Sequence, residues 1–247
     1  MFPLKTIFLF SFLIFSSNCS GETEFLRILK NYVYGWTNAY GVIYHMEILC
    51  RKASHNFPGN FEKNKAAFKN HLLAIRHNNG FIEDQHNYKD MFYGTKSLSD
   101  NSSGLIAIYN IIYYLTKKED IDFAQIIKDL ELDGIYLNGA FGTGIKAPQN
   151  YFLKKGFTAK GTWDKTKFYK IAEEADAFII TIFHTNEDYY KGIHFYAVTK
   201  ENGKYYVHNI EEKYSPKGYA YDSYSQLKKK INPGFGYYTY LTEIYKK

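Results

Sequence analysis

The stretch Asp100-Asn101-Ser102-Ser103-Gly104-Leu105-Ile106-Ala107-Ile108-Tyr109-Asn110 decides how the chain folds. Its polar, glycine-containing start is typical of a loop, and its apolar continuation predicts a helix from Ser103 to Thr116 that is hydrophobic on every side. A helix of that kind has to be buried, so we expect it at the centre of the fold, packed against a sheet. A small hydroxyl side chain, that of Ser103, then stands in its first turn.

A β-hairpin is predicted in the C-terminal third of the chain. Two runs rich in aromatic and β-branched residues, Ile193 to Thr199 and Tyr205 to Ile210, flank the turn sequence Glu201-Asn202-Gly203. His194 lies near the start of the first strand and Asn209 near the end of the second. Because the strands of a hairpin are antiparallel, we expect these two side chains to lie close together.

The remaining patterns place helices first and strands second. Apolar residues recur at three- and four-residue spacing from Thr23 to His77, which predicts two or three helices interrupted by the turn Asn56-Phe57-Pro58-Gly59. The other predicted elements are helices at Phe123 to Leu130, Ala147 to Lys155 (with Pro148 in its first turn) and Lys165 to Ala175, and strands at Ala177 to Phe183 and Phe235 to Ile244. Helices followed by an antiparallel sheet indicate an α+β fold.

Several of these segments resemble one family. The region from about Met91 to Asn209 is similar to the papain-like cysteine peptidases related to bacteriocin-leader peptidases. Ile106-Ala107-Ile108-Tyr109-Asn110 fixes the register, which puts Ser103 where the family has its cysteine. The other matching segments are Leu137 to Thr143, Ala175 to Ile179, Gly192-Ile193-His194 and Tyr205 to Asn209. The resemblance implies a papain-like fold, in which N-terminal helices, including a buried nucleophile helix, pack on a C-terminal antiparallel sheet.

The resemblance also implies catalytic roles for Ser103, His194, Asn209 and Asn101. In the family, a helix N-terminus and a neighbouring imidazole stabilise the cysteine thiolate. His194 would act as the base, Asn209 would orient its ring, and Asn101 would bind an oxyanion together with the backbone N–H of Ser103. In the alternative, His194 and Asn209 are polar members of a half-exposed sheet, and Asn101 is a turn residue next to a helix cap.

A serine in the nucleophile position changes the expected function. A serine hydroxyl has a far higher pKa than a thiol, so a site that holds a thiolate does not by itself activate it. We therefore expect a peptidase-fold protein with weak or absent activity on peptide bonds. The alternatives are a non-catalytic peptide-binding module and an active serine hydrolase. In each case the partner is a peptide or protein substrate or ligand, and no cofactor or metal is expected.

The first twenty residues have the layout of a secretory signal peptide. Lys5 precedes the apolar run Ile7 to Phe15, and small and polar residues follow up to Gly21. The run is too short to cross a bilayer comfortably, so we expect cleavage close to Gly21, a secreted or cell-surface protein, and no membrane span afterwards. A retained anchor and a lipid anchor on Cys19 are the alternatives. Cys50 is then alone in the mature chain, and we expect it to be buried rather than nucleophilic.

Composition and organisation exclude further classes. The 247 residues are 45% hydrophobic, which indicates a folded domain. The net charge of +6 is spread along the chain, with Lys228-Lys229-Lys230 on the exposed face of a short helix, so no nucleic acid partner is expected. We expect a signal peptide at 1–20, a helical N-terminal region at 21–87 and a papain-like domain at 88–247. The helical region is either a removable pro-region or a part of the domain, and the lack of a flexible linker favours the second.

Overall fold

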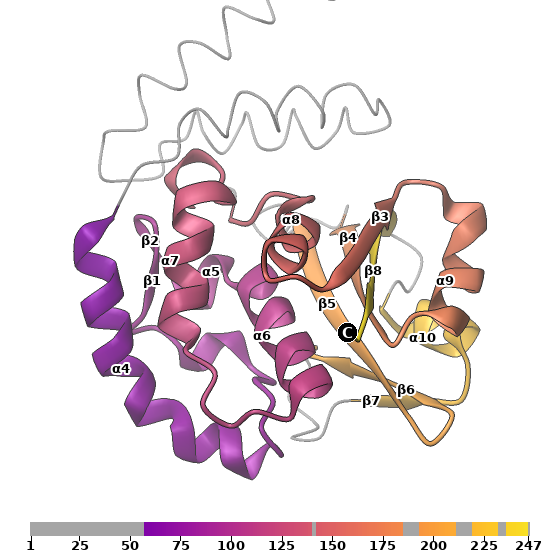
Figure 1. Ribbon diagram of the computed structural model, residues 1–247, viewed down its shortest axis with the longest axis horizontal. Coiled ribbons are helices and arrows are strands. Elements are labelled where there is room, and N and C mark those ends of the chain that lie inside the picture. The colour runs from indigo at the N-terminus through magenta and orange to yellow at the C-terminus, as the bar shows by residue number, and fades with distance from the viewer. Residues whose placement is uncertain (1–56, 140–141, 185–192, 211–218, 232–235, 247) are drawn as a thin grey trace, which may run out of the picture.

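The fold is α+β, as predicted, with an antiparallel sheet and helices concentrated in the N-terminal half (Figure 1). The computed structural model describes residues 57–246, with gaps at 140–141, 185–192, 211–218 and 232–235. The expected signal peptide, Cys50 and the predicted helices before Phe57 lie outside these described residues.

In the described residues, six strands form the main sheet, in the order β3-β8-β4-β5-β6-β7, with every neighbouring pair antiparallel. Their bounds are β3 Thr158–Thr162, β4 Ala177–His184, β5 Ile193–Glu201, β6 Lys204–His208, β7 Tyr219–Tyr221 and β8 Gly236–Tyr245, and a separate two-stranded sheet pairs β1 Phe92–Tyr93 with β2 Lys96–Ser97. The four predicted strands are therefore confirmed, while β3 and β7 were not predicted. The predicted hairpin joins β5 to β6, and both Asn202 (φ 51°) and Gly203 (φ 75°) have the positive φ that a tight hairpin turn requires.

The described helices are α4 Pro58–His77, α5 Leu98–Asn101, α6 Ser103–Thr116, α7 Phe123–Asp133, α8 Ala147–Lys154, α9 Phe168–Glu174 and α10 Tyr224–Ile231, with 3₁₀ turns at Gln85–Asn87, Leu137–Gly139 and Lys165–Lys167. Helices α6, α7 and α8 begin at the predicted residues. The expected loop before Ser103 is instead the short helix α5, whose start Ser97 caps by accepting from the Ser99 N–H, and α4 begins at Pro58, inside the expected turn. Helix α6 has the predicted bounds, and Lys117 ends it in the left-handed conformation (φ 54°). The predicted helix at Lys165 instead opens with a 3₁₀ turn, which Asp164 caps by accepting a hydrogen bond from the backbone N–H of Thr166.

The sheet separates two apolar clusters. Strand β5 alternates between them: Phe195 and Ala197 pack with α6, whereas Tyr196 and Val198 pack with Leu227 of α10. Helices α4 to α8 therefore cover one face of the sheet, and α9 and α10 cover the other (Figure 1). This alternation decides which side chains of β5 can reach the start of α6.

Helix α4 belongs to the same core as α6. The Phe68 ring lies 5.4 Å from the Phe123 ring and 6.2 Å from the Tyr109 ring, measured between centroids. Ile82 is fully buried in the same cluster. The described part of the helical N-terminal region thus shares its core with the residues after 88. Within the described ranges, no helix is long and apolar enough to cross a membrane.

Candidate functional site

Ser103 stands at the first residue of α6, where the sequence placed it. Its side chain is buried, and its Oγ accepts a hydrogen bond from the backbone N–H of Phe195 at 3.4 Å. Within the described part of the chain, this is the one hydrogen bond of the Ser103 hydroxyl. Gly104 allows this close packing, since a Cβ there would lie 2.5 Å from Cβ of Thr143. The start of α6 is thereby fixed between β5 and the segment at Thr143.

His194 and Asn209 lie together, but the contact uses the backbone of Asn209. Nε2 of His194 is 3.2 Å from the carbonyl oxygen of Asn209, and both residues are buried. The imidazole also packs against the Tyr196 ring at 4.3 Å between centroids. Because Tyr196 belongs to the cluster under α10, strand alternation places the His194 side chain on the face of the sheet away from α6.

The side chain of Asn209 holds a loop rather than an imidazole. Its Oδ1 accepts from the backbone N–H of Gln85 at 3.1 Å, and its Nδ2 donates to Oε1 of Gln85 at 3.2 Å. Its backbone N–H donates to Oε2 of Glu83 at 2.9 Å. Asn209 adopts a left-handed conformation (φ 59°), which asparagine tolerates better than most residues, and this turns the chain away at the end of β6.

The side chain of Asn101 also hydrogen-bonds to backbone carbonyl groups. Its Nδ2 donates to the carbonyl oxygen of Gly139 at 2.9 Å and to that of Tyr93 at 3.3 Å. A side-chain amide has two N–H groups, so both are in use. In this structure Asn101 therefore ties the chain at Tyr93 to Gly139, and it has no free N–H group to offer to an oxyanion.

A buried polar chain on the α6 face of the sheet was missed in the sequence. Oε1 of Glu83 lies 2.7 Å from Nδ1 of His208, and Nε2 of His208 lies 2.9 Å from Oγ1 of Thr199. The Phe81 ring stacks on the imidazole at 4.0 Å, with an interplanar angle of 16°. A carboxylate only accepts hydrogen bonds, so Nδ1 carries a proton, and in the neutral ring Nε2 accepts from the Thr199 hydroxyl.

This carboxylate, imidazole and hydroxyl have the order of a catalytic triad, but their surroundings are those of a core. Thr199 and His208 are each 2% exposed, and Glu83 is 8% exposed. A nucleophile has to reach a substrate carbonyl, and the Thr199 hydroxyl is enclosed. We therefore interpret Glu83, His208 and Thr199 as a structural network that attaches the segment around Glu83 to β5 and β6.

Comparison with known proteins identifies no relative, so the proposed function depends on the geometry of the site. No protein-family model, no curated protein and no solved structure gives a significant match to the chain. In the part of the chain that the structure describes, no group of three His, Cys, Asp or Glu side chains is placed to hold a metal ion.

Proposed function

We propose that this chain is a papain-like peptidase-fold protein, of the kind related to bacteriocin-leader peptidases, that binds a peptide or protein and has little or no peptidase activity. The observation that carries the proposal is the hydrogen bond from the Phe195 N–H to Ser103 Oγ. A serine nucleophile needs a base that takes its proton. In the described residues, neither an imidazole nor a carboxylate forms a hydrogen bond with this hydroxyl.

The state of the His194 ring supports the same proposal. A carbonyl oxygen only accepts, so the nitrogen that contacts the Asn209 carbonyl carries a proton. In the neutral ring, Nδ1 is then the one basic nitrogen. The His194 side chain packs against Tyr196 on the sheet face away from α6. General-base catalysis at Ser103 would therefore require the imidazole to leave this packing.

An active serine hydrolase is the second candidate. Ser103 contacts β5 next to His194, since the N–H that it accepts from belongs to Phe195, the residue directly after His194. Catalytic hydrogen bonds in proteins without substrate are often long and shorten when substrate binds. In this candidate a substrate would rotate His194 towards the start of α6.

Active-site labelling separates the two candidates. A fluorophosphonate probe is incubated with the wild-type protein, Ser103→Ala and His194→Ala, and the modified residue is found by peptide mass spectrometry. We expect no labelling at Ser103, together with equal retention of the wild-type protein and Ser103→Ala on an immobilised peptide library. Labelling of Ser103 that disappears in His194→Ala would establish the hydrolase instead.

A further inference from the structure

A hollow lies at the C-terminal end of α6, at the opposite end of the helix from Ser103. Its volume is about 610 Å³, which is in the range of small-molecule sites. Leu115 in its wall is twelve residues from Ser103, or about 18 Å along the helix axis. The apolar lining consists of Ile112, Leu115, Ile121, Ile126, Tyr151 and Phe157. This site is therefore separate from the start of α6.

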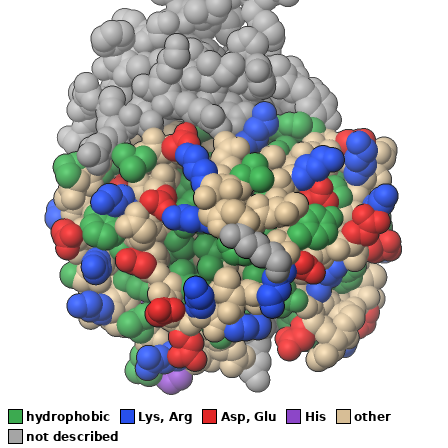
Figure 2. Space-filling view, viewed as in Figure 1, with side chains coloured by type: hydrophobic (Ala, Val, Ile, Leu, Met, Phe, Trp, Pro, Cys, Tyr) green, Lys and Arg blue, Asp and Glu red, His purple; other side chains and the backbone are tan. Residues whose placement is uncertain are grey.

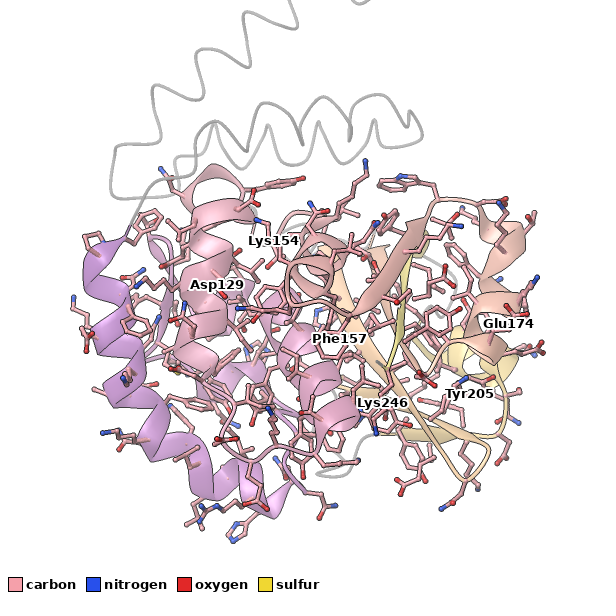
Figure 3. All side chains as sticks on the ribbon, viewed as in Figure 1. Asp129, Lys154, Phe157, Glu174, Tyr205 and Lys246 are labelled. Atoms are coloured by element: carbon pink, nitrogen blue, oxygen red, sulfur yellow. The ribbon has the colours of Figure 1, made fainter. Side chains whose placement is uncertain are left out.

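The rim of the hollow is mainly basic. Lys118, Lys155 and Lys246 line it, against one carboxylate, that of Asp122. Figure 2 shows apolar side chains in a depression near the centre of this face, with Lys or Arg side chains and some Asp or Glu side chains around it, and Figure 3 shows Phe157 and Lys246 near each other beside α6. Burial raises the pKa of the Tyr151 hydroxyl, so this side chain stays neutral and adds no negative charge.

Two of the three lysines are available to a ligand. Lys155 already pairs with Asp129 at 2.7 Å. Neither Lys118 nor Lys246 has a carboxylate within ion-pair distance among the described residues, and both are exposed. Asp122 adds one negative charge to this rim, and its side chain accepts from the backbone N–H of Gln125 at the start of α7, so the three lysines still outnumber it. An anion at the rim would therefore meet two uncommitted ammonium groups.

Polar side chains in the described lining already hydrogen-bond within the protein, so few are left for a peptide backbone. The Thr116 hydroxyl donates to the carbonyl of Ile112 at 2.7 Å, and the side-chain amide of Gln125 donates to Asp129 at 2.7 Å. A peptide that entered the hollow would bury amide groups without partners, and each such group is costly. A hydrocarbon chain carries no such groups. The lining thus favours an apolar chain over a peptide.

From this lining and rim, we propose that the hollow binds a single-chain amphiphile with a carboxylate end. The hydrocarbon chain lies against Ile112, Leu115 and Phe157, and the carboxylate pairs with Lys118 and Lys246 at the rim. The proposal is independent of any chemistry at Ser103, because it uses no residue at the start of α6.

A neighbouring hollow serves as an internal control. It lies between α4 and α6, has a volume of about 720 Å³ and also has an apolar floor. Its rim carries both signs of charge, with Lys65, Lys69 and Arg76 on α4 and Glu119, Asp120 and Asp122 on the opposite side. A carboxylate there would meet like charges as well as opposite ones. Binding that depends on Lys69 rather than on Lys118 would therefore place the ligand in the hollow between α4 and α6.

Isothermal titration calorimetry with the full chain tests the proposal. We expect decanoate to bind, decanol and decyltrimethylammonium to bind at least tenfold more weakly, and affinity to rise about fourfold for each methylene from octanoate to decanoate. The double variant Lys118→Gln/Lys246→Gln should lose at least tenfold in decanoate affinity. The matched variant Lys69→Gln/Arg76→Gln should bind like the wild-type protein. These lysines are exposed, so thermal unfolding should be the same for all variants.

Three results would overturn the proposal. Decanol could bind as tightly as decanoate, which would make the hollow a purely apolar surface. The Lys69→Gln/Arg76→Gln variant could lose binding while the Lys118→Gln/Lys246→Gln variant keeps it. The protein could also sediment with vesicles of anionic phospholipid, in a manner dependent on Lys118 and Lys246, without binding decanoate. The occupant would then be a membrane surface rather than a free amphiphile.

Discussion

The carboxylate of Glu83 lies 2.7 Å from Nδ1 of His208, and it also accepts a hydrogen bond from the backbone N–H of Asn209. The two side chains are 125 positions apart in the sequence and almost completely buried. One carboxylate thus satisfies two donors at the end of β6. Buried polar groups of this kind are costly when they lose a partner, so Glu83 is expected to matter more for stability than its place in a loop suggests.

We predict that Glu83→Leu destabilises the protein by about 3 kcal/mol, because it leaves the His208 ring and the Asn209 N–H without an acceptor. Glu83→Gln keeps one acceptor oxygen and should cost less. Urea unfolding followed by circular dichroism measures both. Glu62→Leu, the same change at an exposed position on α4, is the matched control and should alter the free energy of unfolding by less than about 0.5 kcal/mol. Equal effects at both positions would contradict the structural role of Glu83.

A second prediction concerns pH. Burial raises the pKa of Glu131, although hydrogen bonds from Asn60 and the Gly94 N–H act in the opposite direction. The folded state therefore binds this proton more tightly than the unfolded state does, and the stability from Glu131 is present at low pH and lost as pH rises through the folded pKa. Glu131→Gln keeps the acceptor oxygen and removes this loss.

The measurement compares the free energy of urea unfolding at pH 4 and pH 7. We expect the difference between Glu131→Gln and the wild-type protein to shift in favour of the variant at pH 7. Glu62→Gln removes an exposed carboxylate and should show no such shift. A constant difference between Glu131→Gln and the wild-type protein across this range would mean that the folded and unfolded pKa values of Glu131 are the same.

The third prediction addresses the nucleophile position. Ser103→Cys should fold and yet show no peptidase activity, because in this structure Oγ contacts a backbone N–H and the His194 ring lies with Tyr196. The rate of iodoacetamide alkylation as a function of pH measures the thiolate fraction. A thiol that reacts rapidly at pH 6 and becomes slow in Ser103→Cys/His194→Ala would show a functional ion pair and would favour the hydrolase candidate.

The fourth prediction concerns the close contact behind Ser103. Gly104→Ala should cost about 1–3 kcal/mol, because the new Cβ would lie 2.5 Å from Cβ of Thr143 and one segment must move. Thr143→Gly removes the opposing side chain, so the double variant should be more stable than the sum of the two single effects predicts. Urea unfolding of the four proteins gives this coupling energy. A coupling near zero would show that the two segments separate at little cost.

Local patterns in the sequence were sufficient to predict much of the fold. Helix α6 is apolar throughout, and the turn at Asn202 and Gly203 fixes the register of its hairpin, so both elements have the predicted positions. Strand β3 was missed because Thr158–Thr162 contains Lys160 and Gly161. Among the described strands, it lies at the edge of the sheet and pairs only with β8. A short edge strand is stabilised by its neighbour more than by its own pattern.

The candidate site was predictable in part. The approach of His194 to Asn209 follows from the antiparallel hairpin, and the same register pairs Ala197 with His208, which puts His208 on one face with Thr199. The contact between His208 and Thr199 can therefore be predicted from the hairpin register alone. The contact between His208 and Glu83 cannot, since nothing in the sequence near Glu83 indicates contact with a strand 125 positions away. The roles of Asn209 and Asn101 depend on contacts of the same long range.

The attachment of the Glu83 and Gln85 segment to β6 has a consequence for proteolysis. Four hydrogen bonds join these two residues to His208 and Asn209. A protease that removed residues up to 87 would therefore take away partners of the sheet itself and expose the end of β6. The N-terminal segment thus holds the end of β6 in place. After cleavage, the β5–β6 hairpin would have to rearrange before its buried polar groups found new partners.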